Sequence, residues 1–402
     1  MSAQMVPLGE VTRWLSGGTP NRSVSKYWQG EIPWISASTL KDSEISESDQ
    51  HLSPEGVAVG SKMAPVGSTL FLVRGSALYN EIRAGLVVKP VCFNQDVKAL
   101  VPDPSVVPKF LTYSLLGRSE DLLKLVSTAS NSTGVLDTKL VKAFEILLPP
   151  LPEQRAIAAA LSDADGLIGA LDAVIAKKRA IKQAATQQLL TGKKRLPGFS
   201  GEWRATTLGE TADIKNGATP STQIPAYWNG QIPWCTPTDI TGTPGKYLLT
   251  TERSITVEGL ENCAASLLPV GALLLCSRAT IGEIKIAASP VCTNQGFKSL
   301  VCKSGISNEF LYYLLLTLKP QMIERAIGST FLEIGKPDVA SIKLRTPEYS
   351  EQTAIAAVLS DMDAEIAALE RRREKTEQIK QGMMQQLLTG RIRLVEPPGT
   401  AA

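Results

Sequence analysis

The sequence has very little of the residue that most enzymes use for acid–base chemistry near neutral pH. His51 is the only histidine among 402 residues, so a Ser-His or Cys-His nucleophile pair has at most one candidate. Glycine-rich phosphate and dinucleotide loops, zinc-protease helices and nucleophile elbows are absent, as is the Asn-Pro-Pro-aromatic motif of amino-methyltransferases. A long chain with one histidine favours binding over catalysis.

Paired cysteines and long apolar runs are also missing. The six cysteines form no Cys-x-x-Cys pair, which argues against a zinc site or a disulfide framework, and we interpret them as reduced, mostly buried thiols. No run of about 18 apolar residues is present to span a membrane, and the first residues lack a signal-peptide pattern. We therefore expect a cytoplasmic protein without a membrane partner.

The chain lacks the excess of positive charge that is usual in nucleic-acid-binding domains. Its net charge is +3; residues 1–148 hold 14 basic and 14 acidic side chains, and residues 196–346 hold 13 and 12. The densest basic runs, 177–179 and 371–373, fit a solvated helix face as well as a DNA or partner contact. The bulk charge therefore does not indicate a nucleic-acid-binding protein.

What the sequence does contain is an internal repeat. A signature in residues 153–192 recurs 198 positions later, in residues 351–390. The first copy reads Glu153-Gln154, Ala156–Ala159, Leu161–Asp163 and Gln187–Gly192, and the second reads Glu351-Gln352, Ala354–Ala357, Leu359–Asp361 and Gln385–Gly390. Each copy follows a domain-sized segment of mixed composition, so the repeat predicts two domains and two long helices.

Both copies have the apolar spacing of a coiled coil. Apolar residues alternate in steps of four and three over residues 157–175 and 355–369, which is a heptad pattern. The register then shifts, as at a stutter, and resumes at Ile181 and Ile379. Turn and cap residues predict helices over 152–190 and 350–388.

Two such helices are expected to pair with each other. A helix of 39 residues is about 58 Å long and cannot bury its apolar stripe alone. A whole domain lies between the two copies, so the helices have room to pair antiparallel. The alternative interpretation is two independent surface helices.

The two domains share one plan but differ in their loops. Leu208-Gly209-Glu210, Tyr227-Trp228 and Asn294-Gln295 lie 200 positions after identical residues. Arg74 and Arg278 match at an offset of 204, and residues 75–84 share little with 279–284. Because recognition commonly resides in loops on a fixed scaffold, two related but unlike targets are expected.

These patterns together predict an α+β fold. It contains two homologous mixed α/β domains separated by a pair of long antiparallel coiled-coil helices, with an internal pseudo-two-fold repeat. The predicted segments are residues 1–148 for the first domain, 149–195 for the first helix, 196–346 for the second domain, 347–395 for the second helix and 396–402 for a flexible tail.

The ordered double occurrence of these motifs resembles the specificity (S) subunit of type I restriction–modification systems. The residues that carry the resemblance are Gly17–Pro20, Tyr27-Trp28, Ile32–Trp34, Asn94-Gln95, Pro149–Gln154 and Gln187–Gly192, with their second-half counterparts. Residues 346–350 depart from the pattern, since they replace the proline run.

The resemblance implies a non-catalytic subunit with two target-recognition domains, which binds a bipartite, asymmetric site in double-stranded DNA. It implies two methyltransferase subunits and restriction/translocase subunits as partners. The chain itself is expected to bind no cofactor or metal: S-adenosylmethionine is expected in the methyltransferase subunit, and ATP and Mg in the restriction subunit.

Candidate DNA contacts are polar loop residues, because Arg reads guanine, Asn and Gln read adenine, and hydroxyl groups contact phosphates. A hydrogen bond within the fold explains each of them at least as well, and Trp28, Trp34, Trp228 and Trp234 are expected in the core. The candidates are Ser36, Ser38, Thr39, Arg74, Asn94, Gln95, Asn131 and Thr133 in the first domain, and Thr236, Thr238, Asp239, Arg278, Asn294, Gln295, Ser329 and Thr330 in the second.

Two other functions stay open from the sequence. One is a duplicated coiled-coil scaffold that binds protein partners without reading DNA. The other is a stand-alone nuclease built on Glu283, although Glu283-Ile284-Lys285 has no suitably spaced acidic partner. The target sequence and the gap between half-sites are not readable from the loops.

Overall fold

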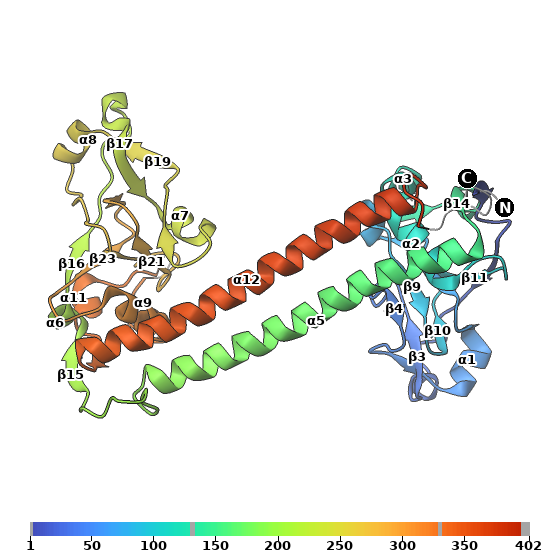
Figure 1. Cartoon of the computed structure of the whole chain (residues 1–402), viewed down its shortest axis with the longest axis horizontal. Helices are drawn as coiled ribbons and strands as arrows, with labels where there is room; N and C mark the ends of the chain where they lie inside the picture. Colours follow the sequence, from blue (N-terminus) through green and yellow to red (C-terminus); the bar gives the residue numbers. More distant parts are fainter. Residues whose placement is uncertain (1–2, 129–132, 329–331, 395–402) are drawn as a thin grey trace, which may run out of the picture. The chain divides into compact units, whose positions relative to one another are not determined.

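The computed structural model describes residues 3–128, 133–328 and 332–394 (Figure 1). The predicted tail at 396–402 lies outside the described residues. The chain forms two compact units, one from Met1–Ala173 with Glu370–Ala402 and one from Val174–Leu369. The boundary between the units therefore falls within both long helices.

The first domain is built on a five-stranded sheet with the order β2-β11-β7-β9-β4. Leu70, Phe71 and Leu100 are fully buried in it, which fits the apolar composition of the central strands. Helix α2 (Pro108–Gly117) packs on β7 and β9. The strands are β2 (Thr12–Ser16), β4 (Glu44–Ile45), β7 (Thr69–Leu72), β9 (Ala84–Val87) and β11 (Val97–Pro102).

Smaller sheets complete this domain, in the orders β5-β3-β10-β6, β12-β13-β8 and β1-β14. Their strands are β1 (Gln4–Pro7), β3 (Ile32–Ile35), β5 (His51–Leu52), β6 (Met63–Ala64), β8 (Arg74–Gly75), β10 (Val91–Phe93), β12 (Val126–Thr128), β13 (Gly134–Leu136) and β14 (Glu145–Leu148). Short helices are α1 (Pro54–Gly60), α3 (Ser119–Leu123) and α4 (Thr138–Ala143), with 3-10 turns at Ser25–Trp28 and Ser76–Tyr79.

The second domain repeats this plan, as the duplication predicts. Its sheets have the orders β16-β23-β20-β21-β18, β19-β17-β22 and β15-β24. The strands are β15 (Arg204–Thr207), β16 (Ala212–Asn216), β17 (Trp228–Cys235), β18 (Tyr247–Leu248), β19 (Arg253–Ile255), β20 (Leu273–Leu275), β21 (Ile284–Ala287), β22 (Cys292–Thr293), β23 (Lys298–Cys302) and β24 (Lys343–Thr346). The helices are α6 (Leu208–Thr211), α7 (Pro237–Gly242), α8 (Val257–Glu261), α9 (Asn308–Thr317), α10 (Lys319–Glu324) and α11 (Lys336–Ala340), with a 3-10 turn at Pro225–Tyr227.

The two long helices are α5 (Leu151–Leu189) and α12 (Tyr349–Leu387). Both have the predicted length of 39 residues and begin one residue earlier than expected. Gly192 and Gly390 have positive φ angles of 70° and 73°, which suits the residue after a helix end. None of the helices in the described part of the chain is long and apolar enough to span a membrane.

The predicted stutter in these helices is wrong. Ile181 and Ile379 are 45% and 52% exposed, so the apolar register does not resume there. The seam instead continues unbroken in steps of three and four from Ile175 through Lys178 and Lys182 to Leu189. A lysine fits at a seam position because its alkyl stem packs there while its ammonium group reaches an acid on the other helix.

Ion pairs show that the helices run antiparallel within each unit. In the first unit, Lys380 Nζ lies 2.6 Å from Asp165 Oδ1, and Arg373 Nε lies 3.0 Å from Asp172 Oδ1. In the second unit, Lys178 Nζ lies 2.6 Å from Glu365 Oε1, and Lys182 pairs with Asp363. As the residue number rises on one helix it falls on its partner, which confirms the predicted antiparallel pairing.

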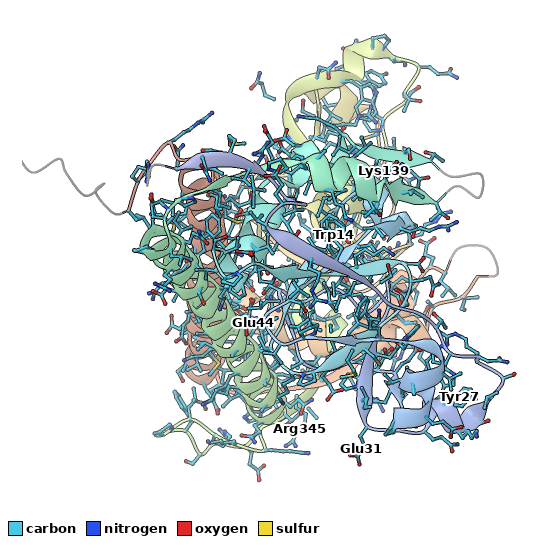
Figure 2. All side chains as sticks on the ribbon, turned by 90° about the vertical axis from the view of Figure 1, so that its right-hand side faces the viewer. Trp14, Tyr27, Glu31, Glu44, Lys139 and Arg345 are labelled. Atoms are coloured by element: carbon cyan, nitrogen blue, oxygen red, sulfur yellow. The ribbon has the colours of Figure 1, made fainter. Side chains whose placement is uncertain are left out.

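Each domain is joined to its helix pair by a lysine and a tyrosine. Lys109 Nζ lies 2.7 Å from Glu44 Oε1 and donates to Ser162 Oγ of α5, also at 2.7 Å, and Glu44 lies beside this helix (Figure 2). The Tyr113 hydroxyl donates to Asp165 Oδ2 at 2.7 Å. The second domain uses Lys246 and Tyr313 in the same way, toward Ser360 and Asp363 of α12.

Helix starts are fixed by the repeated Glu-Gln pair. The Gln154 side chain accepts from the Val107 amide at 2.8 Å and donates to the Pro149 carbonyl at 2.8 Å. Glu153 is 2% exposed and forms a bidentate ion pair with Arg393. Gln352, Glu351 and Arg195 repeat these contacts in the second unit, so this part of the repeat is structural.

The revised seam predicts opposite outcomes for two truncations on α5. Leu171→Ala should lower the free energy of unfolding by about 2–5 kcal/mol, because Leu171 is buried between the helices. Ile181→Ala should change it by less than about 0.5 kcal/mol, because Ile181 is exposed. Urea denaturation followed by circular dichroism measures both; a large loss for Ile181→Ala would restore the stutter.

Candidate nucleic-acid interface

The candidate contacts of the first domain gather at one edge of a small sheet. Strands β3 and β10 are parallel neighbours, with Trp34 opposite Cys92, so the residues that follow them leave the sheet at the same edge. Ser36 directly follows β3 and Asn94 directly follows β10. The Asn94 amide donates to the Ile35 carbonyl at 2.9 Å. The strand order thus brings together two segments that are distant in the sequence.

Main-chain hydrogen bonds add Arg74 to this edge. The amides of Val73 and Arg74 both donate to the Asp96 carbonyl, at 2.9 and 3.2 Å. Strand β13 pairs with β8, so Thr133, which precedes β13, also lies near Arg74. Three of the predicted segments therefore meet at one place in the first domain.

The second domain repeats the arrangement. Strands β17 and β22 are parallel, and the Asn294 amide donates to the Cys235 carbonyl at 3.1 Å. The Ser277 amide donates to the Gly296 carbonyl at 2.8 Å, which places Arg278 beside the turn that contains Asn294. The predicted contacts Asn131, Ser329 and Thr330 lie outside the described residues.

The two matched asparagines close the turn that they begin. Asn94 Oδ1 accepts from the Asp96 amide at 3.1 Å, and Asn94 Nδ2 donates to the Asp96 carboxylate at 3.0 Å. Asn294 Oδ1 accepts from the Gly296 amide at 2.9 Å. Because these bonds use their side chains within the fold, both residues support the site more directly than they could read a base.

The neighbouring glutamines are exposed at the edge of the turn. Gln95 Oε1 accepts from the Thr19 hydroxyl at 2.7 Å, and Gln295 Oε1 accepts from the Thr219 hydroxyl at 2.5 Å. These bonds orient each side chain from its carbonyl end. Each glutamine lines a hollow, and its NH₂ group is a donor.

Ser36, Ser38 and Thr39 bond mainly to one another. The Ser36 amide donates to Thr39 Oγ1 at 2.8 Å, and the hydroxyls of Ser36 and Ser38 lie 2.9 Å apart. Ser36 is buried, whereas Ser38 is exposed. Of the three, Ser38 is the one placed for an outside contact.

Thr236 and Asp239 form the N-terminal cap of α7. The Asp239 carboxylate accepts from the Thr236 amide and hydroxyl, both at 2.7 Å, and from the Glu252 amide at 2.8 Å. Both carboxylate oxygens are thus used within the fold. Thr238, in the first turn of the same helix, is exposed.

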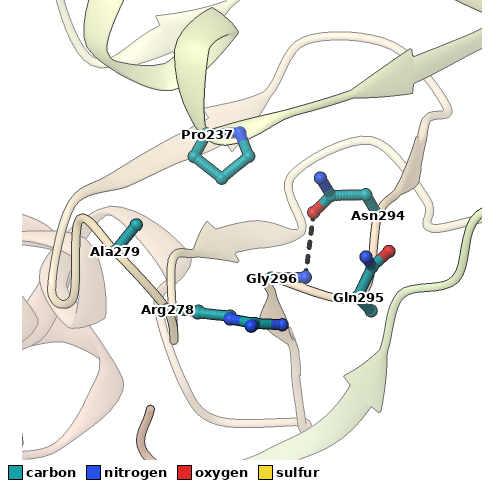
Figure 3. Close-up of a pocket in the computed structure, with 6 residues that line it drawn as sticks. All are labelled: Pro237, Arg278, Ala279, Asn294, Gln295 and Gly296. Carbon is teal, nitrogen blue, oxygen red and sulfur yellow. Dashed lines mark hydrogen bonds between the residues drawn. The ribbon is translucent and has the colours of Figure 1, made fainter. Parts of the chain in front are cut away.

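In the second domain these segments enclose a hollow of about 260 Å³. Figure 3 shows Arg278 and Gln295 on one side of it, with Pro237 across from Arg278 and Ala279. Gly296 and Asn294 complete the lining. No lining residue in the described part of the chain is acidic.

The corresponding hollow of the first domain is larger and more polar. It has a volume of about 450 Å³, and Arg74, Gln95, Asp96, Lys98 and Asp137 are among the residues that line it. Lys98 Nζ donates to Ser16 Oγ at 2.9 Å, and burial lowers the pKa of its ammonium group. The two hollows share three matched positions, 74/278, 95/295 and 96/296, and the rest of their linings come from different positions.

Sequence reasoning missed three of these lining residues. Asp96, Lys98 and Asp137 were not among the candidate contacts, although Lys98 and Lys298 lie 200 positions apart. The matched lysines were a signal that the repeat offered. The repeat offered no such signal for Asp96 and Asp137, because the matching residues of the second domain are glycines, at positions 296 and 335.

A glycine in each domain lets the chain pass directly over the turn that begins at Asn94 or Asn294. A Cβ atom on Gly17 would lie 2.1 Å from the Phe93 carbonyl oxygen, and one on Gly217 would lie 2.0 Å from the Asn294 carbonyl oxygen. These approaches are possible only without a side chain. The segments Gly17–Pro20 and Gly217–Pro220 thus help to form the backbone of the site.

Trp34, Trp228 and Trp234 are buried, as predicted, whereas Trp28 is half-buried and packs against Trp34. Trp34 and Trp234 are 1% and 3% exposed, and their indole nitrogens donate to the carbonyls of residues 18 and 218. Each forms an edge-to-face pair with Trp28 or Trp228, with ring centroids 5.1 and 5.0 Å apart. They are not free to stack on bases.

The described residues show no catalytic constellation. His51 pairs with Glu47, and Glu283 pairs with Lys319, so neither stands in an acid–base or metal cluster. All six cysteines are free thiols, and burial raises the pKa of Cys92 to about 12. No group of three potential metal ligands occurs within residues 3–128, 133–328 and 332–394.

One protein-family model matches this chain twice, at residues 2–177 and 200–381. Its description is "Type I restriction modification DNA specificity domain". The two matches cover most of the chain, and each spans one domain together with most of the long helix that follows it. The repeat found in the sequence is therefore a repeat of this family's domain.

Curated relatives carry the same description. The specificity subunit of the type I restriction enzyme MjaIX from Methanocaldococcus jannaschii is 36% identical over 180 residues, which are 44% of this chain and 42% of that one. The EcoR124I/EcoR124II specificity subunit from Escherichia coli is 29% identical over 44% of each chain. Against these two, the match spans less than half of the relative's length. The MjaVIII specificity subunit from M. jannaschii is 26% identical over 97% of this chain and 93% of its own.

Solved structures have the same fold. The crystal structure of a type I restriction–modification S subunit from M. genitalium has a TM-score of 0.61 over 96% of each chain, at 16% identity. A chain from a structure of a type I restriction–modification complex has a TM-score of 0.60 over 97% of this chain and 98% of its own, at 20% identity. The pair of α/β domains with two long helices is thus a known architecture.

Substitution of Gly17 tests whether the close backbone contact at this position requires glycine. Gly17→Ala should lower the free energy of unfolding by about 1–3 kcal/mol, because the added Cβ meets backbone that cannot move aside. Gly166→Ala is the matched control on the exposed face of α5, where a Cβ meets nothing within 4 Å. It should raise stability by up to about 1 kcal/mol. Urea denaturation that shows equal effects for both variants would contradict the requirement for glycine at this position.

Proposed function

The chain belongs to the type I restriction–modification DNA specificity family, and from this premise we propose that it reads a bipartite, asymmetric DNA target with one half-site for each domain. The observation that carries the proposal is the duplicated site. The same parallel strands, turn and main-chain hydrogen bonds recur in both domains, while the side chains that line the two hollows differ. A shared backbone arrangement with different lining side chains suits two different half-site sequences in one DNA target.

The chemistry of the linings fits the edges of bases in the major groove. Arg74 and Arg278 are exposed at the hollows, and an arginine pairs well with guanine O6 and N7. Gln95 and Gln295 present amide groups of the kind that read adenine. Ser38 and Thr238 are exposed, and their hydroxyl groups suit contacts with phosphates.

Partner subunits complete the proposed activity. The two domains have almost no net charge, so much of the phosphate-dependent affinity has to come from elsewhere. We propose that two methyltransferase subunits, which bind S-adenosylmethionine, assemble with this chain and supply it. Restriction/translocase subunits, which use ATP and Mg, join the same complex. This chain selects the site in the cytoplasm and performs no catalytic step.

The long helices are proposed to set the gap between the half-sites. Each is one uninterrupted helix of 39 residues, and cross-helix ion pairs fix the register of the pair. Two modules that read one face of a duplex must be about one helical turn of DNA apart, or roughly 34 Å. A stiff helical element can hold such a distance.

Replacing the two arginines separately should relax the two half-sites separately. Arg74→Ala should lose about 1–3 kcal/mol of base discrimination in one half-site, and Arg278→Ala the same in the other. Methylation mapping of a randomised library with the assembled methyltransferase complex reports both half-sites at once. Arg13→Ala and Arg204→Ala are the controls, since each removes an exposed arginine that does not line a hollow. Unchanged discrimination in both half-sites would refute base reading by these residues.

Lengthening the helix pair should lengthen the tolerated gap. Four helical residues added after Leu171 and four after Arg373 extend both helices at paired positions, by about 6 Å or roughly two base pairs. Methylation of a library with randomised gaps should then favour a longer gap with unchanged half-sites. An insertion in α5 alone is the control, because it breaks the ion-pair register. A gap that stays the same after the double insertion would remove the role of the helices in spacing.

A further inference from the structure

Ala279 has a backbone conformation that alanine rarely adopts. Its φ angle is 60°, in the left-handed region that Cβ disfavours and glycine accepts. Among the described non-glycine residues, only Asn229, with φ of 62°, shares this feature, and asparagine tolerates it better. The matching position in the first domain is Gly75. The methyl group of Ala279 is therefore a strained feature of the second domain alone.

The fold does not need this methyl group. The turn is closed by main-chain hydrogen bonds, from the Thr280 amide to the Arg278 carbonyl at 2.7 Å and from the Gly282 amide to the Cys276 carbonyl at 3.0 Å. Ala279 is exposed. Glycine would make the same bonds with less strain, and strained residues that persist cluster where ligands are held.

The methyl group contributes to a small apolar surface inside the hollow. Ala279 and Pro237 line the hollow together and face its interior (Figure 3). Gly296 keeps the space open, because a Cβ there would lie 3.5 Å from Pro237 Cγ. Ala279 and Pro237 thus give the hollow an apolar surface.

Polar groups flank this patch. The Arg278 side chain extends along the same hollow, and its guanidinium end points toward Gln295 (Figure 3). Gln295 is held through its carbonyl oxygen by Thr219, which leaves its NH₂ group as a donor. Donors next to an apolar surface form a pattern that a base-pair edge can match.

We propose that Ala279 and Pro237 form the contact for the 5-methyl group of a thymine in the second half-site. The inference rests on the proposed function and specifies what this site reads. In the major groove the methyl group marks thymine, and small apolar side chains read it by contact. Arg278 and Gln295 then lie where a purine next to that thymine presents its acceptors. The first domain has Gly75 in place of Ala279 and Asp96 in place of Gly296, so it reads a different base there.

The proposed contact is tested by removing the Ala279 methyl group and the thymine 5-methyl group, separately and together. The target is first determined by methylation mapping with the complex of this chain and its methyltransferase subunits. Each thymine of the second half-site is then replaced by deoxyuridine, which lacks only the 5-methyl group. With the wild-type chain, one replacement should weaken binding about four-fold, the value for one buried methyl group. With Ala279→Gly, the same replacement should have no effect.

Thermal unfolding separates this role from a structural one. Ala279→Gly should keep or raise the melting temperature, because it relieves strain, while it loses thymine discrimination. Asn229→Gly is the matched control: Asn229 is the other described non-glycine residue with a positive φ angle and does not line the hollow, so discrimination of this variant against deoxyuridine should equal that of the wild type. A half-site without thymine, or an equal loss for wild type and Ala279→Gly, overturns the inference but leaves the proposed function intact. A complex without sequence-specific methylation overturns the proposed function, and this inference with it.

Discussion

A buried carboxylate at the first turn of each long helix is the constraint on which the rest of the structure depends. Glu153 and Glu351 are both 2% exposed, and an ionised carboxylate at that depth requires a charged partner. Each partner comes from the segment that follows the other helix: Arg393 pairs with Glu153, and Arg195 pairs with Glu351. Every unit therefore contains the beginning of one long helix and the end of the other. A parallel pair would bring the two beginnings together and leave both carboxylates without an arginine.

Within each domain, most of the residues that support the site differ from the residues that are proposed to recognise DNA. The residues that are identical in the two copies mostly hold the site together: Asn94 and Asn294 close the turn, and Gly17 and Gly217 let the chain pass over it. Some residues that differ line the hollows: Asp96 lines the first and its match Gly296 the second, and Ala279, whose match is Gly75, also lines the second. Identity between the copies therefore mostly marks structure, apart from the matched arginines and glutamines at the hollows, and difference between the copies marks what each one distinguishes.

Much of this was predictable from the sequence, and the failures have physical causes. The duplication, the two mixed domains and both long helices follow from matched Trp, Pro and Gly residues and from heptad spacing, and the helix bounds are off by one residue. The predicted stutter was wrong because Lys178 and Lys182 occupy seam positions, where a heptad pattern predicts apolar residues. Their acidic partners are on the other helix, so the local sequence does not reveal them. For the site, the sequence pointed to the segments around 36, 74 and 94 but not to their meeting, which depends on the parallel pairing of β3 and β10. The sequence around Ala279 does not predict its strain, because alanine at a position does not indicate a positive φ angle there.

The reading site is assembled almost entirely by main-chain bonds, such as Asn94 to Ile35, Arg74 to Asp96 and Ser277 to Gly296. Any amino acid except proline can donate such a bond, so selection acts on the lining side chains without endangering folding. Exchange of one or two of them then changes the word that is recognised while the architecture is inherited intact. A lineage that carries this scaffold has a short mutational path from one DNA target to the next.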